Sequence, residues 1–102
     1  NEPCNTILLS GVLCKPPILR RTPLGREICD FLLAVNRKYH RADYLPCIAW
    51  GSLALFCSQL SVGDPISLHG RLQSRTYVKR TAESSVEHTA YEISVMSIDA
   101  IP

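Results

Sequence analysis

Hydrophobic and polar positions alternate along several short segments of this chain, which is the pattern of half-buried β-strands. One phase of residues 66–78 carries apolar or small side chains, namely Ile66, Leu68, Gly70 and Leu72. The other phase is polar. Further strands are predicted over residues 6–14, 28–37, 44–51 and 91–98. Residues 6–14 are apolar in both phases, which predicts a central strand, and Gly11 is expected to bend it.

Only residues 52–60 have helical periodicity. Their apolar side chains recur at i, i+3, i+4 and i+7, as Leu53, Phe56, Cys57 and Leu60. Ser52 is the expected N-cap. Proline and glycine predict a turn over residues 20–26, and polar stretches predict loops over residues 36–43 and 79–88. Pro46 cannot donate a ladder hydrogen bond, so its strand is expected to lie at an edge or to carry a bulge there.

Three strands, one short helix and two strands is the element order of the five-stranded OB barrel. That barrel binds oligonucleotides across one face and with its hairpin loops. We therefore expect an all-β fold with one short helix, formed by residues 1–102 as a single OB-fold domain. A different small β-barrel with one helix would give a similar order.

The composition is that of one ordinary globular domain, with 102 residues of which 46% are hydrophobic. No apolar run approaches the ~20 residues that span a bilayer, and no basic segment followed by an apolar stretch begins the sequence. The five cysteines include no C-x-x-C pair and predict buried free thiols rather than a disulfide framework or a zinc site. A cytoplasmic protein without a membrane partner is therefore expected.

A net charge of +2 conceals an uneven distribution. All eleven lysines and arginines lie between Lys15 and Arg80, where they face only four acidic residues, which leaves an excess of 11 − 4 = +7. Residues 81–102 carry four acidic residues and no lysine or arginine. A local basic excess of this kind is compatible with a polyanionic partner.

The polar phase of residues 66–78 continues into Arg71, Gln73, Arg75 and Tyr77. Side chains two residues apart on a strand are ~7 Å apart, so this row can neutralise phosphates and stack a base. An ordinary solvated strand face would have the same pattern.

Catalytic chemistry is not indicated. The three histidines, His40, His69 and His88, lie far apart without a carboxylate or cysteine at ligand spacing. No glycine-flanked nucleophile turn is present. We expect no catalytic site, no metal and no cofactor.

Several short motifs follow one another in a fixed order: Asn5-Thr6-Ile7, Phe31-Leu32-Leu33-Ala34-Val35-Asn36-Arg37, Trp50-Gly51, Val62-Gly63-Asp64, Gly70-Arg71-Leu72-Gln73-Ser74-Arg75 and Tyr91-Glu92-Ile93. Over about residues 5–97 the chain thereby resembles the bacterial SSB-type single-stranded DNA-binding proteins. The resemblance implies binding of single-stranded DNA without sequence preference, protecting it during replication, repair and recombination in the nucleoid. It also implies a homo-oligomer, a tetramer in preference to a dimer.

The family stacks bases on aromatic residues, and the matching positions here are Tyr39, Tyr44, Trp50 and Tyr77. Basic residues near them are expected to contact phosphates: Arg37, Lys38, Arg71, Arg75, Lys79 and Arg80. For Trp50 a plain core position is the alternative, and for Tyr39 a solvated loop position. The apolar second face of residues 6–14, formed by Leu8, Val12 and Cys14, is the expected subunit interface.

Family members usually continue into a flexible tail with an acidic tip that recruits replication and repair proteins, whereas this sequence ends at Pro102. The sequence therefore makes no prediction about binding to replication and repair proteins. The short loop of residues 38–43 could also reduce the length of strand bound. Two other functions remain: a dimer that resembles primosomal replication proteins and acts as an adaptor, or an OB-fold module that binds protein through Tyr44 and Trp50.

Overall fold

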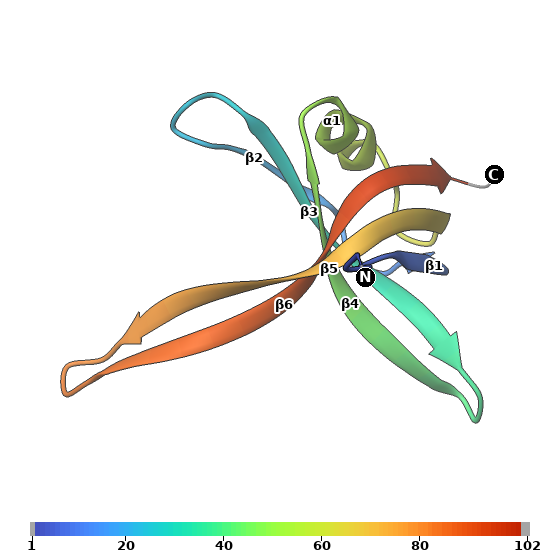
Figure 1. The fold of residues 1–102 in the computed structure, drawn as a ribbon. Helices are drawn as coiled ribbons and strands as arrows, with labels where there is room; N and C mark the ends of the chain where they lie inside the picture. Colours follow the sequence, from blue (N-terminus) through green and yellow to red (C-terminus); the bar gives the residue numbers. More distant parts are fainter. Residues whose placement is uncertain (1, 101–102) are drawn as a thin grey trace.

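The computed structural model describes residues 2–100, whose strands wrap into a barrel from which long hairpins project (Figure 1). The elements are β1 (Ile7–Leu13), β2 (Ile18–Arg21), β3 (Glu27–Arg37), β4 (Arg41–Trp50), α1 (Ser52–Ser58), β5 (Pro65–Arg80) and β6 (Ser85–Ala100). Each predicted strand and the predicted helix is present. The additional short strand, β2, lies beside β3.

The strands follow the order β1-β5-β6-β4-β3-β2, and a further pairing of β1 with β3 closes a barrel of five strands. The β4–β6 ladder is parallel and short, joining Cys47 to Ile93 and Ile48 to Ser94, whereas the other ladders are antiparallel. This topology confirms the predicted all-β OB fold with one short helix.

The barrel interior takes one phase of each strand, as the alternating pattern predicted. The buried side chains come from every barrel strand and from α1, and include Leu13, Phe31, Leu33, Ala54, Cys57, Ile66, Leu68, Ile93 and Val95. Two glycines allow the strands to approach closely enough for closure. A Cβ atom at Gly11 would collide with the carbonyl oxygen of Ala34, and one at Gly70 would collide with the carbonyl oxygen of Ser94. The β5–β6 register shifts beside Gly70, as in a β-bulge.

Both predicted polar loops are largely wrong. The segment expected over residues 36–43 contains only three residues between β3 and β4, and the segment expected over residues 79–88 shrinks to residues 81–84 between β5 and β6. The physical reason is that both hairpins extend beyond the barrel as two-stranded arms. Both faces of such an arm are exposed, so its strands lack the apolar phase that marks a half-buried strand.

Two details of the predicted helix are also wrong. Gly51, with φ of 63°, is the N-cap, and no side chain caps the helix. Phe56 is 46% exposed, whereas Ala54 and Cys57 face the core. Leu53, Cys57 and Leu60 do pack on the core, so the predicted stripe is wrong only at Phe56.

Pro46 lies at an edge, as predicted. It pairs with Leu32 of β3, while the β4–β6 ladder begins only at Cys47. Within the described ladders, the part of β4 that precedes Cys47 therefore has a partner strand on one side alone.

All five cysteines are free, and Cys29, Cys47 and Cys57 are buried as predicted. Cys4 is exposed and Cys14 is half-buried, so the prediction of burial is wrong for these two. Cys4 precedes β1 and therefore lies outside the barrel. Burial raises the pKa of Cys29 to about 11 and the pKa values of Cys47 and Cys57 to about 12.

Candidate nucleic-acid interface

A groove runs between the β2–β3–β4 side of the barrel and the base of the β5–β6 hairpin. We call it the Trp50 groove, and its lining residues are Arg20, Thr22, Ile28, Asp30, Phe31, Pro46, Cys47, Ile48, Trp50, Gln73, Arg75 and Glu92. It brings the predicted site residues Trp50 and Arg75 to one place, although they lie 25 positions apart in sequence (75 − 50). The groove exists because both β4 and β5 pair with β6.

Trp50 ends β4 and is half-buried, so it lies at the wall of the groove rather than in the barrel core. The guanidinium carbon of Arg26 lies 4.7 Å from the centroid of its ring, a cation–π contact. Sequence analysis did not single out Arg26. The β3–β4 register explains the contact, because Trp50 pairs with Ile28, two residues beyond Arg26.

Tyr44 lies on the same phase of β4 as Trp50, and its side chain is 61% exposed. Six residues of strand separate the two aromatics by ~20 Å. Tyr44 therefore lies on the β3–β4 arm, outside the Trp50 groove, where it can contact a longer ligand that leaves the groove along this arm.

The tip of the β3–β4 arm gathers a second group of predicted residues. Asn36, Arg37, Lys38, Tyr39 and Arg41 line a surface depression there. Tyr39 is 89% exposed, which agrees with a solvated position and leaves its ring free to stack. Arg37 pairs with Asp43 at 3.3 Å, whereas Lys38 and Arg41 form no ion pair within residues 2–100. Arg41 was not among the predicted residues.

The β5–β6 arm carries a third group, with Tyr77, Lys79 and Arg80. Tyr77 is 42% exposed, and its ring stacks on His88 with 5.5 Å between centroids and 20° between planes. The guanidinium carbon of Arg75 lies 5.6 Å from the Tyr77 centroid. The His88 contact depends on the β5–β6 register, in which Tyr77 faces His88, and that register was not readable from the sequence.

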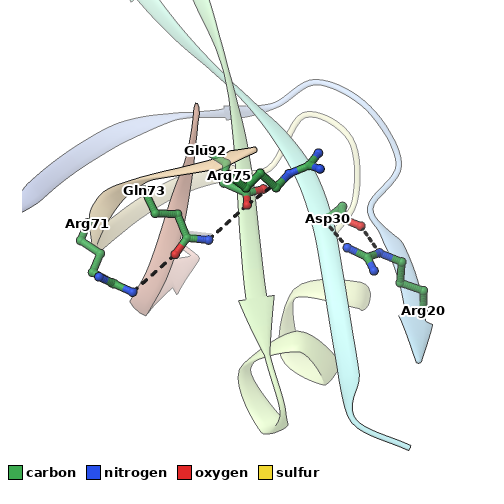
Figure 2. Close-up of polar contacts among 6 residues, drawn as sticks. All are labelled: Arg20, Asp30, Arg71, Gln73, Arg75 and Glu92. Carbon is green, nitrogen blue, oxygen red and sulfur yellow. Dashed lines mark hydrogen bonds and ion pairs between the residues drawn. The ribbon is translucent and has the colours of Figure 1, made fainter. Parts of the chain in front are cut away.

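Polar side chains on one face of β5 form a chain of contacts that ends on β6 (Figure 2). Arg71 donates through Nη2 to Oε1 of Gln73 at 3.5 Å, and Gln73 donates through Nε2 to Oε1 of Glu92 at 3.1 Å. The Nε atom of Arg75 lies 3.6 Å from the same Glu92 oxygen. These contacts place Arg71, Gln73 and Arg75 on one face, as the alternating pattern predicted.

A second ion pair, which also lines the groove, joins β2 to β3 (Figure 2). Arg20 donates to both carboxylate oxygens of Asp30, at 2.6 Å and 3.4 Å. This hydrogen bonding raises the pKa of Arg20, and the charges of Asp30 and Glu92 add to the rise. Neither Arg20, Asp30 nor Glu92 was identified as a site residue, because an isolated charged residue on a strand is usually a solvated position.

The residues that the structure describes contain no cluster of three or more potential metal ligands. Among the same residues, no helix has both the length and the apolar character needed to cross a membrane.

A comparison of the sequence with models of known protein families gives a match over nearly the whole chain. Residues 4–101 match the family model described as the single-strand binding protein family. The chain belongs to this family.

Two relatives and one solved structure illustrate the similarity. The single-stranded DNA-binding protein of Clostridium tetani is 36% identical over 80 residues, which cover 72% of this chain and 55% of that protein. Single-stranded DNA-binding protein A of Bacillus subtilis is 38% identical over 80 residues, covering 72% of this chain and 46% of that protein. The wild-type single-stranded DNA-binding protein of Thermus aquaticus superposes with a TM-score of 0.79 at 27% identity, covering 97% of this chain and 41% of that one. This chain spans about half the length of its curated relatives.

Proposed function

We propose that this protein binds single-stranded DNA without sequence preference, by stacking bases on aromatic side chains and contacting phosphates with lysine and arginine. The observation that carries the proposal is the path formed by Trp50 in its groove and by Tyr44 and Tyr39 on the adjoining arm. Membership of the single-strand binding protein family supports it. Relatives named as single-stranded DNA-binding proteins support it as well.

Stacking on aromatic rings accepts any base, because every base has a π-face, and each stacked base contributes ~1–3 kcal/mol. Phosphate contacts are equally insensitive to sequence. On the β3–β4 arm these contacts would come from Arg37 and Lys38, and on the β5–β6 arm from Lys79 and Arg80. Arg71 would contribute from β5, whereas Arg75 lines the groove and is paired there with Glu92.

Fluorescence titration tests the proposal directly, because Trp50 is the only tryptophan. Oligo(dT) should quench Trp50 emission at low salt, and the affinity should fall steeply as salt rises because bound phosphates release counterions. Duplex DNA of equal length should bind far more weakly, since its bases are not free to stack. Equal binding of duplex and single strand, or no binding at low salt, would rule the proposal out.

We further propose that the protein assembles as a homo-oligomer, a tetramer in preference to a dimer. Leu8 on β1 is 77% exposed, an unusual state for a leucine within a strand next to the barrel core. Beyond its β5 partner, β1 pairs with β3 only at Val12 and Leu13, which leaves residues 7–11 open at that edge in the described ladders. A second copy that covers this edge would account for both features.

Protection of single strands during replication, repair and recombination, within the cytoplasmic nucleoid, follows as the proposed role. A dimeric adaptor that resembles primosomal replication proteins is the second candidate. The exposed edge at Leu8 is compatible with both a tetramer and a dimer. The mass of the native protein distinguishes the two. A protein-binding OB module would instead leave Trp50 emission unchanged when oligo(dT) is added.

A further inference from the structure

Glu92 lines the Trp50 groove, where it contacts both Gln73 and Arg75 (Figure 2). A single oxygen, Oε1, accepts the Gln73 hydrogen bond at 3.1 Å and pairs with Arg75 at 3.6 Å. The Glu92 side chain is only 13% exposed, whereas that of Arg75 is 61% exposed. The carboxylate is therefore the fixed partner, and the guanidinium is held against it from the solvent side.

This pairing gives Arg75 a different environment from the other basic residues of β5. Arg71 contacts only the neutral amide of Gln73, and neither Lys79 nor Arg80 has a carboxylate partner within residues 2–100. Among the four basic residues of β5, Arg75 is the one whose charge is balanced by a carboxylate within residues 2–100. A phosphate that approached Arg75 would have to displace Glu92 or lie close to its negative charge.

The other charged residues that line the groove are balanced by ion pairs as well. Its two cations, Arg20 and Arg75, are matched by its two anions, Asp30 and Glu92, so the lining carries no net charge. The hydrogen bond to Asp30 is the main cause that raises the pKa of Arg20, and the charge of Glu92 adds to it from across the groove. Such a lining suits the uncharged face of a base beside Trp50 better than it suits a phosphate.

We propose that Glu92 limits the affinity of the groove for single-stranded DNA, by occupying Arg75 and Gln73 and by repelling phosphate. The proposal rests on the single-stranded DNA binding proposed above. It assigns the phosphate contacts to the cations of the two arms and leaves the Trp50 groove to a base. Glu92 thus lowers the affinity for single-stranded DNA and contributes no favourable contact to it.

Glu92→Gln tests this role, because it removes the charge and keeps the size and the acceptor oxygen. Its affinity for oligo(dT) at low salt should rise about three- to tenfold, the effect of relieving one unit-charge repulsion across ~6 Å at an effective dielectric constant of about 40–80, close to that of water. The slope of log K against log salt should steepen by about one unit, because Arg75 becomes available for a phosphate.

Glu87→Gln is the matched control. Glu87 lies five residues from Glu92 on β6, on the opposite face of the arm, is exposed, and forms no ion pair within residues 2–100. Both substitutions change the net charge equally. An affinity gain no larger in Glu92→Gln than in Glu87→Gln would overturn the proposal, as would a loss of affinity in Glu92→Gln with the circular dichroism spectrum unchanged.

Arg75 supplies a second arm of the experiment. Arg75→Gln in the otherwise unchanged protein should weaken binding, because it leaves the charge of Glu92 uncompensated in the groove. The double variant Arg75→Gln/Glu92→Gln should lose most of the gain seen in Glu92→Gln. A full gain in the double variant would overturn the proposal, since Glu92 would then act independently of Arg75. If no variant binds oligo(dT), the proposed function fails instead.

Discussion

The ring of Tyr77 lies against the imidazole of His88 across the β5–β6 arm, with 5.5 Å between their centroids. Arg75 contacts the same ring from its own strand, at 5.6 Å. Tyr77 is thus held between strand neighbours, unlike Tyr39, which is 89% exposed at the opposite arm. The two arms therefore offer a base two different surfaces: a braced tyrosine on one and a free tyrosine on the other.

Alanine substitution should distinguish stacking from structural support. Trp50→Ala and Tyr77→Ala should each weaken binding by ~1–3 kcal/mol with little change in the salt slope, because a lost stack removes no phosphate contact. Anisotropy of a labelled oligonucleotide measures this, since Trp50→Ala removes the intrinsic fluorophore. His88→Ala is the control for Tyr77, because it removes the cross-strand neighbour and leaves the tyrosine available to a base. Unchanged affinity in both aromatic variants, with the fold intact, would assign these rings to packing or to a subunit contact.

Loss of a basic side chain, unlike loss of an aromatic one, should change the salt slope. Arg71→Ala should reduce the salt slope by about one unit, because Arg71 has no carboxylate partner within residues 2–100 and is free to contact a phosphate. Arg20→Ala serves as the comparison, since Arg20 is bound to Asp30 at 2.6 Å and its charge is already balanced. Titrations over a range of salt concentrations provide both slopes. A smaller change for Arg71→Ala than for Arg20→Ala would contradict this assignment of phosphate contacts.

The strands and the barrel could be predicted because burial leaves a period of two in the sequence, as at Ile66 and Leu68. The arms could not, because residues such as Lys79 and Val86 pair across a ladder that is exposed on both faces and has no apolar phase.

The residues of the candidate site were likewise predictable only in part. Trp50 was identifiable from its residue type and the motif around it, whereas the role of Glu92 depends on the β5–β6 register, in which it lies opposite Gln73.

The buried thiols predict how stability depends on pH. Burial holds the pKa of Cys29 at about 11 and those of Cys47 and Cys57 at about 12 in the folded protein, above the ordinary thiol value of 9.0 that the unfolded chain would have. Above pH 9 the unfolded state therefore releases protons first, and stability should fall as pH rises from 9 towards 12. Each thiol contributes up to about 1.4 kcal/mol per pH unit between pH 9 and its own pKa in the folded protein. Urea unfolding at pH 8, 9 and 10 measures the trend.

Thiol labelling provides an independent check on the same residues. Cys4 is exposed and should react with a thiol reagent at pH 8 in the native protein, whereas Cys29, Cys47 and Cys57 should react only after denaturation. Cys47→Ala should reduce the loss of stability above pH 9 relative to the unchanged protein. Rapid native labelling of all five cysteines would show that the barrel opens far more readily than its packing implies.

The open edge of β1 predicts how assembly responds to a single charge. Leu8→Lys should give a folded species of smaller mass, because a lysine at a position that is 77% exposed costs the isolated barrel little but is unfavourable inside an apolar contact between copies. Light scattering at micromolar concentration measures the mass. The smaller species should bind oligo(dT) more weakly, since one barrel covers only a few nucleotides.

Leu24→Lys is the matched control, because Leu24 is 98% exposed and lies in the turn between β2 and β3, away from this edge. A monomeric mass for the unchanged protein would refute the assembly and leave the proposed DNA binding intact.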